Sequence, residues 1–331
     1  MKKYIAILLV AAMATLGISA CRKENSNKET KVQKDSDMKV VTTIFPEYDW
    51  VRQIAGEEAD QMDITMLLDN GVDLHSYQPT AEDIMKVSDC DLFVYVGGES
   101  DAWVDDALKQ AKNKDMQVVN LLDVLGNSVK EEEVIEGMEP EEEEEEGGEE
   151  EEPEYDEHVW LSVKNAEVLS KVIADALEKA DPDHKDVYQE NVSAYSEKLK
   201  NLDAKYQEVV DGASQKTLLF GDRFPFRYLV DDYGLSYYAA FVGCSAESEA
   251  SFETISFLAN KVDELGLKDI MAIENSNQKI AKTIIENTKE KNQKILTLYS
   301  MQSTISDDVK NGTTYLSVME KNLEVLKEAL Q

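Results

Sequence analysis

The stretch HKDVYQENVSAYSEKLKNLDAKYQEVVDGA, residues 184–213, predicts one unusually long helix in a chain of 331 residues. Its apolar side chains recur at helical spacing, at Val187, Val192, Tyr195, Leu199, Leu202, Tyr206 and Val209 or Val210. A helix of this length is well above the mean of about 11–12 residues. It suits a rigid connection between two lobes, so residues 184–212 are expected to link them.

Strand and helix patterns alternate on both sides of this helix. Before it, the predicted strands are KVVTTIF, DITMLL, DLFVYVGG and MQVVNL, and after it they are TLLFG, SYYAAF, IMAIE and ILTLY. Strands that alternate with helices favour a parallel sheet with helices on both faces. The sequence therefore predicts an α/β fold of two lobes, residues 38–183 and 213–331, each with a mostly parallel sheet flanked by helices. Ligands are expected at the carboxyl ends of the strands.

The first residues predict export and anchoring. Two lysines precede an apolar run from Ile5 to Ile18, which is too short for an ordinary membrane-spanning helix and is typical of a secretory signal. The ending ISAC resembles a lipobox, so residues 1–21 are expected to be a lipoprotein signal peptide in which Cys21 becomes the lipid-bearing first residue of the mature protein. Cleavage elsewhere is the alternative. Residues 22–37 are polar and predict a flexible tether. The chain is thus expected on the extracytoplasmic face of the cell membrane, held there by a lipid anchor.

The charge of the chain excludes one large class of partners. The formal net charge is −34, and the segment 131–157 contains 18 acidic residues and no basic ones. Nucleic acid binding needs clustered Lys and Arg, so nucleic acid is not an expected partner, whereas divalent cations suit this charge. Like charges at this density repel, and the segment is predicted to be a mobile loop of the first lobe.

Cysteine is sparse in the predicted mature protein. After Cys21 only Cys90 and Cys244 remain. A disulfide between them is one alternative in an oxidising compartment, and two buried thiols are the other and the expected one.

Two of the three histidines lie in loops where binding residues are expected. His75 follows the strand DITMLL, and His158 lies between the acidic segment and a helix. Imidazole nitrogens suit borderline cations such as zinc and favour zinc over calcium or magnesium. Considered alone, either histidine also suits a structural role at the surface, as does His184 at a helix start.

The sequences around His75 and His158 resemble a family of metal receptors. GVDLHSYQPTAEDI resembles the G-x-D-x-H-x-Y-x-P loop of the solute-binding proteins that serve zinc and manganese ABC importers. YDEHVWLSVKNA resembles that family's D-P-H-x-W-L-S-P motif, and the resemblance runs from about Lys39 to Leu330. It implies a metal site between two α/β lobes joined by one long helix, with His75 and His158 as the first two ligands.

The resemblance breaks at the third ligand. Family members place His or Glu five residues before the tyrosine that here is Tyr228, and this chain has Arg223 at that position. Arginine keeps its proton and cannot bind a metal ion. The neighbouring Asp222 is therefore predicted to replace the third ligand, while Arg223 turns aside and pairs with a carboxylate.

The fourth ligand is less constrained by the resemblance. Glu274 is the better donor in the segment where manganese-binding members supply an acidic ligand, and a capping or pairing role for it is an equal alternative. Tyr77, Glu247 and Glu249 are expected around the site. The two glutamates are expected to order their loop or to hold Arg223.

The resemblance implies a monomeric, membrane-anchored receptor that binds Zn²⁺ and delivers it to an ABC transporter permease. A Mn²⁺ receptor of the same fold is the alternative. The chain is not expected to be an enzyme, because it contains no HExxH, G-x-S-x-G or other compact catalytic motif. An extracellular metallohydrolase with Glu274 as base, and a binding protein for an organic solute or a surface adhesin, are the rival classes.

The acidic segment stands where many zinc-binding members carry a histidine-rich loop. Its summed field is expected to raise the cation concentration near His158, over a distance of about 8 Å at physiological salt. An insertion that only aids solubility is the alternative.

Overall fold

The computed structural model describes residues 38–138, 154–245 and 249–331. Asp37–Gln331 form one compact unit. Within the described residues, no helix is both long and apolar enough to cross a membrane. The predicted signal peptide with Cys21, and the tether after it, lie outside the described residues.

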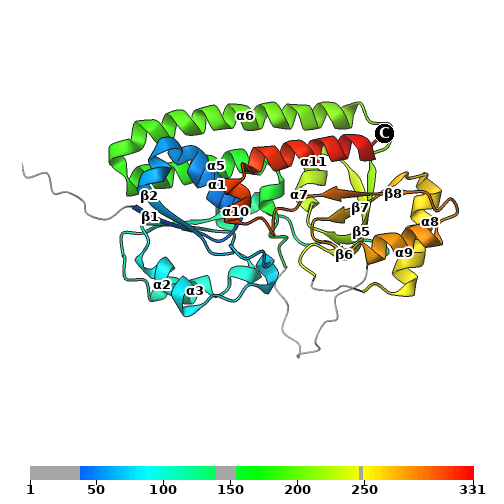
Figure 1. Cartoon of the computed structure of the whole chain (residues 1–331), viewed down its shortest axis with the longest axis horizontal. Coiled ribbons are helices and arrows are strands. Elements are labelled where there is room, and N and C mark those ends of the chain that lie inside the picture. Colours follow the sequence, from blue (N-terminus) through cyan, green and yellow to red (C-terminus); the bar gives the residue numbers. More distant parts are fainter. Residues whose placement is uncertain (1–37, 139–153, 246–248) are drawn as a thin grey trace, which may run out of the picture. The chain divides into compact units, whose positions relative to one another are not determined.

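Two four-stranded parallel sheets form the framework of this unit (Figure 1). Their strand orders are β2-β1-β3-β4 and β6-β5-β7-β8, and every pairing is parallel. The strands are β1 (Met38–Thr42), β2 (Met62–Met66), β3 (Leu92–Tyr95), β4 (Gln117–Asn120), β5 (Thr217–Phe224), β6 (Ser236–Val242), β7 (Asp269–Ile273) and β8 (Lys294–Leu298). The two sheets thus share one topology, in which the second strand pairs outside the first. The predicted α/β class with two parallel sheets is confirmed.

Helices connect the strands in both halves. The first lobe, with β1–β4, contains α1 (Phe45–Ala55), α2 (Ala81–Asp89), α3 (Val104–Lys109) and α4 (Leu121–Leu125). The second lobe, with β5–β8, contains α7 (Arg227–Tyr233), α8 (Phe252–Leu265) and α9 (Lys279–Asn287). The remaining helices are α5 (Val163–Ala180), α6 (Lys185–Asp211), α10 (Ser306–Lys310) and α11 (Tyr315–Ala329).

The long helix α6 packs on helices of both lobes. It contacts α1 and α5 on one side of the unit and α7 and α11 on the other (Figure 1). Its buried face differs by one position from the predicted one, because Tyr188 is fully buried whereas Val187 is exposed. The tyrosine is preferred at this point because its hydroxyl donates a hydrogen bond of 2.7 Å to the carboxylate of Asp181.

The C-terminal helix α11 is a second connection that the sequence did not predict. It lies beside α6 and also contacts α1 of the first lobe and β8 of the second (Figure 1). At its start, the amide of Tyr315 donates to the buried carboxylate of Asp49 in α1, at 2.9 Å. The largest apolar core is continuous through both lobes. The division into residues 38–183, 184–212 and 213–331 therefore stays a prediction.

The two ends of the acidic segment are more regular than predicted. Glu131 and Tyr155 form an antiparallel bridge, and the amide of Asp156 donates to the carbonyl of Lys130 at 2.9 Å. Tyr228 fastens this ribbon to the second lobe, because its hydroxyl donates to the Asp156 carbonyl at 2.7 Å and accepts from the Lys130 amide at 3.0 Å. The residues that precede His158 are thus fixed in place. Residues 139–153 lie outside the described part of the chain.

Candidate metal centre

His75 lies in the loop that follows β2, within the single turn η2 (Leu74–Ser76). Asp73 caps this turn by accepting a hydrogen bond of 3.1 Å from the His75 amide. Nδ1 of His75 lies 2.9 Å from the hydroxyl of Ser100 and 3.4 Å from Oε2 of Glu157. The carboxylate beside Nδ1 favours the tautomer with the proton on Nδ1, in which the lone pair of the imidazole lies on Nε2.

His158 is fully buried and starts the turn η5 (Val159–Leu161). Asp156 accepts hydrogen bonds from the His158 amide at 2.9 Å and from Nδ1 at 3.1 Å. The turn is fixed by Trp160, whose indole donates to the Ser300 carbonyl and whose own carbonyl accepts from the Tyr315 hydroxyl. The Asp156 carboxylate therefore orients the ring of His158, and the backbone after His158 is held by hydrogen bonds to Ser300 and Tyr315.

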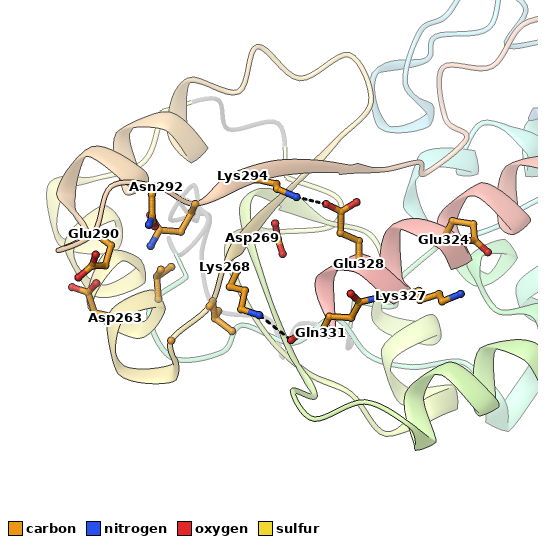
Figure 2. Close-up of a pocket in the computed structure, with 14 residues that line it drawn as sticks. Asp263, Lys268, Asp269, Glu290, Asn292, Lys294, Glu324, Lys327, Glu328 and Gln331 are labelled. Carbon is orange, nitrogen blue, oxygen red and sulfur yellow. Dashed lines mark hydrogen bonds and ion pairs between the residues drawn. The ribbon is translucent and has the colours of Figure 1, made fainter.

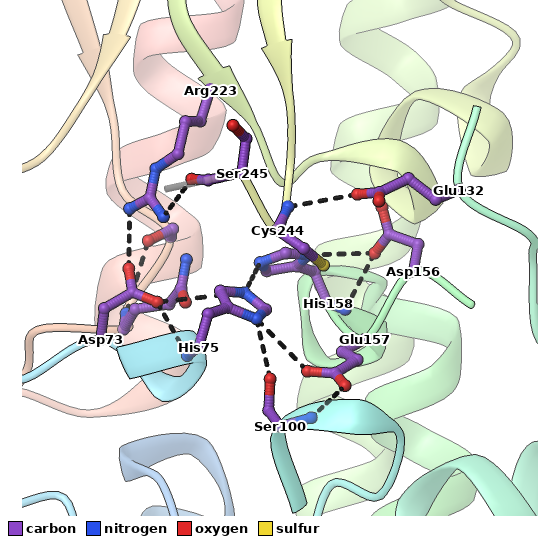
Figure 3. A network of polar contacts seen from close by, with 12 residues as sticks. Asp73, His75, Ser100, Glu132, Asp156, Glu157, His158, Arg223, Cys244 and Ser245 are labelled. Carbon is purple, nitrogen blue, oxygen red and sulfur yellow. Dashed lines mark hydrogen bonds and ion pairs between the residues drawn. The ribbon is translucent and has the colours of Figure 1, made fainter. Parts of the chain in front are cut away.

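The two imidazoles meet through their Nε2 atoms, which lie 3.2 Å apart (Figure 3). Two nitrogens bound at 2.0–2.1 Å to one tetrahedral zinc ion lie about 3.3 Å apart. Metal-binding histidines nearly always direct the other ring nitrogen to a carboxylate, carbonyl or water, as Asp156 and Glu157 allow here. The pair is therefore arranged as two ligands of one ion.

The protonation of the two histidines differs. Burial and the adjacent His158 lower the pKa of His75 to about 3, so this ring is neutral. Burial acts to lower the pKa of His158 as well, but the carboxylates of Asp156 and Glu157 outweigh it and raise the pKa. A proton therefore dissociates less readily from His158 than from His75.

Cys244 completes a group of three possible ligands. Its sulfur and one nitrogen of each histidine all lie within 4.8 Å of one another, and the described residues contain no other such group of His, Cys, Asp or Glu. Cys90 and Cys244 are both free thiols, with Cys90 buried and Cys244 partly exposed. From the sequence, Cys244 was predicted to be a buried thiol, with a disulfide to Cys90 as the alternative, and it was not predicted to be a ligand. Its place in the loop after β6, the strand that corresponds to β2, was the signal that could have identified it.

Arg223 turns aside and pairs with a carboxylate, as predicted. The carboxylate is that of Asp73 in the first lobe, at 2.7 Å, and the guanidinium also donates to the Ser245 carbonyl at 3.2 Å. Glu249 was expected to order its loop or to hold Arg223; its carboxylate pairs with Lys279 at 2.9 Å, which leaves the ordering of the loop as the role that stays a prediction. Glu247 lies outside the described residues.

Asp222 and Glu274 bind backbone amides rather than the imidazoles. The pairing register of β5 with β6 shifts between Phe220 and Arg223. The Asp222 carboxylate accepts hydrogen bonds from the amide of Arg223 and, at 3.3 Å, from the amide of Ile273. Glu274 accepts from the amide and hydroxyl of Ser300 at 2.7 and 2.8 Å. Both carboxylates line a cavity of about 420 Å³ together with Arg223 and Asp73. Neither belongs to the three-ligand group, and their role as ligands stays a prediction.

Tyr77 lies in the same loop as His75 but serves another purpose. Its hydroxyl donates to Asp83 at 3.0 Å, and Asp83 also accepts from the amide and hydroxyl of Thr80 at the start of α2. Tyr77 therefore joins the loop of His75 to the N-terminal cap of α2. The hydrogen bond of its hydroxyl goes to Asp83 and not to an imidazole. The expectation that Tyr77 lies around the site, outside the ligands, stays a prediction.

A larger cavity of about 820 Å³ lies at the other end of the second lobe (Figure 2). Residues of α8, β7, β8 and α11 line it. Two of its lysines have partners there: Lys294 pairs with Glu328, and Lys268 donates to the Gln331 carbonyl. It contains no histidine or cysteine. This cavity is separate from the three-ligand group.

Comparisons with known proteins identify the family of the chain. The family model described as zinc-uptake complex component A, periplasmic (ZnuA), matches residues 40–329. The chain is similar to the zinc-binding lipoprotein AdcA of Streptococcus pneumoniae, with 34% identity over 97% of this chain, and it spans 60% of the length of that relative. It is also similar to the high-affinity zinc uptake system protein ZnuA of Bacillus subtilis, with 32% identity over 99% of this chain and 98% of the relative.

Solved structures give the same result. The Zn(II)-bound ZnuA-like domain of Streptococcus pneumoniae AdcA has a TM-score of 0.68 at 30% identity, over 89% of this chain and 99% of that domain. The laminin-binding protein Lmb of Streptococcus agalactiae, described as bifunctional with adhesin and metal transporting activity, has a TM-score of 0.68 at 26% identity, over 89% of this chain and all of that one. These matches confirm the resemblance carried by the two histidine motifs. The chain belongs to the ZnuA family of zinc-uptake components.

Proposed function

We propose that the chain binds one Zn²⁺ ion through Nε2 of His75 and Nε2 of His158 and delivers it to an ABC transporter permease. The observation that carries this proposal is the 3.2 Å separation of the two Nε2 atoms, with each Nδ1 turned toward a carboxylate. Two nitrogens so placed suit zinc, and the carboxylates beside the Nδ1 atoms orient the two rings. The names of the zinc-binding relatives support the choice of ion.

The proposal includes an anchor and a location. Cys21 carries the lipid, and the protein acts on the extracytoplasmic face of the membrane, where the permease receives the ion. The relatives named lipoproteins and periplasmic uptake components support this placement. Changing Cys21 to Ala is expected to move the protein from the membrane fraction to the soluble exported fraction, and unchanged fractionation would contradict the anchor.

The family is one of uptake components and not of enzymes, which speaks against the metallohydrolase alternative. Delivery requires binding that a partner can reverse. The site lies where loops of both lobes meet, so small movements of these loops change the number of ligands around the ion. Zinc uptake by cells that lack the chain, with and without the restored gene, tests delivery separately from binding.

Isothermal titration of metal-stripped residues 37–331 tests the binding step. We expect saturable zinc binding with one ion per chain, lost in His158→Ala and kept in His184→Ala. The third histidine is a matched control because it pairs with Asp181 at the start of α6, away from the site. Tight binding of manganese together with weak binding of zinc would mean that the chain carries manganese. Absence of saturable binding of either ion would refute the proposal.

A further inference from the structure

The loop after β6 is built to hold Cys244 beside the histidines. The Cys244 amide donates a hydrogen bond of 3.2 Å to Glu132 of the acidic segment. The carbonyl of the following residue, Ser245, accepts a hydrogen bond from Arg223. Gly243 lies so close to His158 that an added Cβ would stand 2.9 Å from the imidazole Cε1 and 3.0 Å from the Phe224 carbonyl. A side chain at residue 243 would push the loop away from the ring. The position of Cys244 is thus fixed from both sides.

The distances suit a metal–sulfur bond after a small adjustment. In a tetrahedral zinc site, a sulfur at 2.3 Å and a nitrogen at 2.0–2.1 Å lie about 3.6 Å apart. The sulfur of Cys244 and the two imidazole nitrogens lie within 4.8 Å of one another. The sulfur therefore has to approach by about 1 Å at most. A rotation about its Cα–Cβ bond moves the sulfur by more than that.

One carboxylate near Nε2 of His75 is already paired with an arginine. Oδ1 of Asp73 lies 3.9 Å from Nε2 of His75, and Oδ2 of the same carboxylate pairs with Arg223 at 2.7 Å. Oxygen donors suit magnesium, calcium and manganese, whereas thiolates suit zinc and other soft ions. Arg223, at the position where relatives have their third ligand, thus restrains a hard donor and leaves the thiol as the neighbour of the two imidazoles.

We propose that Cys244, bound as a thiolate, is the third protein ligand of the ion held by His75 and His158, and that it makes the site selective for zinc over manganese. This inference rests on the proposed function and replaces Asp222 as the third donor. On binding, the S–H bond breaks, a sulfur–metal bond forms and the proton leaves to solvent. The ion then has a His₂Cys set with one open position, which a water molecule or a carboxylate of the adjoining cavity can fill.

Cobalt is a spectroscopic probe for this ligand. Loading residues 37–331, which form one compact unit, with one equivalent of Co²⁺ is expected to give an intense sulfur-to-cobalt charge-transfer band in the near ultraviolet. The band should persist in Cys90→Ala, which lacks the other thiol, and disappear in Cys244→Ser. Because the band is first read on the unaltered protein, a variant that fails to fold does not remove the test.

Affinities complete the experiment. Cys244→Ser is expected to weaken zinc binding by at least about 10-fold while manganese binding changes by less than about threefold. Bound zinc should also slow alkylation of Cys244 by iodoacetamide in the Cys90→Ala background. A wild-type cobalt complex without the band, together with tight zinc binding that needs His158, would overturn the cysteine ligand and leave the proposed function standing. Absence of zinc binding by the wild type would instead refute the proposed function.

Discussion

The two lobes have the same strand order but contribute to the site in different ways. His75 follows β2, and Cys244 follows the corresponding strand β6. In the first lobe, His75 is held by residues of that lobe and of the segment that leads to His158. In the second lobe, Arg223 pairs with Asp73, and the amide of Cys244 donates to Glu132. Both carboxylates belong to the part of the chain that precedes α6. The histidine pair is therefore preformed, although the turn at His158 is also held by Ser300 and Tyr315 of the second half of the chain. The placement of Arg223 and Cys244 depends on contacts with the first lobe.

The largest expected effect tests whether the preformed pair dominates binding. His75→Ala removes one of two aligned nitrogens, so we expect zinc affinity to fall by more than the roughly 10–100-fold that loss of an outer-sphere partner causes. Competition with a chromogenic chelator measures this loss, with His184→Ala as the control. A loss smaller than that of Cys244→Ser would reverse the comparison of the lobes.

The pH dependence separates the two contributions. The pKa of His158 is raised in the folded, metal-free protein. Protonation of His158 therefore stabilises the folded form at pH values below about 6.5, the usual pKa of histidine. This stabilisation is lost as the pH rises through the raised pKa. Zinc competes with this proton, so its affinity falls as pH falls. One proton from His158 and one from Cys244 predict a fall of up to about 100-fold per pH unit in the wild type and about 10-fold in Cys244→Ser. Equal slopes in zinc titrations of the two proteins would contradict a thiolate ligand.

The carboxylates that orient the histidines are expected to act more weakly than the ligands. Asp156→Asn keeps the shape of the side chain and removes the charge that favours the Nδ1–H tautomer of His158, so zinc affinity should fall by about 10–100-fold. Glu249→Gln, in an exposed pair with Lys279, is the matched control and should leave the affinity unchanged. If both variants bind zinc like the wild type, the first lobe does not depend on its carboxylates.

The ion pair between Arg223 and Asp73 measures how strongly the lobes are coupled. Its side chains are only 19% and 23% exposed, so the interaction is stronger than that of a surface pair, and we expect a coupling free energy of about 1–2 kcal/mol. A double-mutant cycle with Arg223→Met and Asp73→Asn, followed by chemical unfolding of the metal-free protein, gives this number. Arg223→Met also frees Asp73 and should strengthen manganese binding. Additive effects in the cycle would show that the lobes are held by other contacts.

The smallest expected effect concerns the acidic segment. Changing the ten glutamates of 141–146 and 149–152 to Gln keeps the length of the chain and removes its local field. The zinc association rate should fall by at most about 10-fold at low salt and be unchanged at high salt, because the field is screened. Stopped-flow measurements with a fluorescent zinc indicator test this. An unchanged rate at low salt would leave solubility as the function of the segment.

The parts of the molecule that depend on local pattern could be predicted from the sequence. The alternation of strands and helices follows from apolar periodicity, and the His75 loop follows a strand at whose end ligands bind in such sheets. His75 and His158 are 83 positions apart, and the family motifs alone indicated that they act together. Arg223 could be excluded as a ligand from its chemistry.

What could not be predicted depends on contacts between distant segments. Asp222 and Cys244 are both near the expected site in sequence, but the irregularity of β5 turns Asp222 toward the β7 amide of Ile273. The approach of Cys244 to the histidines requires Gly243 to lie against the ring of His158, and nothing in the local pattern indicates this contact. Tyr188 replaced Val187 on the buried face of α6 because of a partner, Asp181, that lies in the preceding turn.

The pairing of α11 with α6 has a mechanical consequence. A single helix between two lobes permits bending and twisting of the lobes, whereas two helices packed side by side resist both motions. In addition, α11 is joined to α1 by the hydrogen bond from the Tyr315 amide to Asp49. Wide opening of the lobes would have to break these bonds and expose the apolar core that both lobes share. We therefore expect the ion to leave through movement of the short loops that carry His75 and Cys244, so that a docking partner has to displace a few residues and not half of a protein.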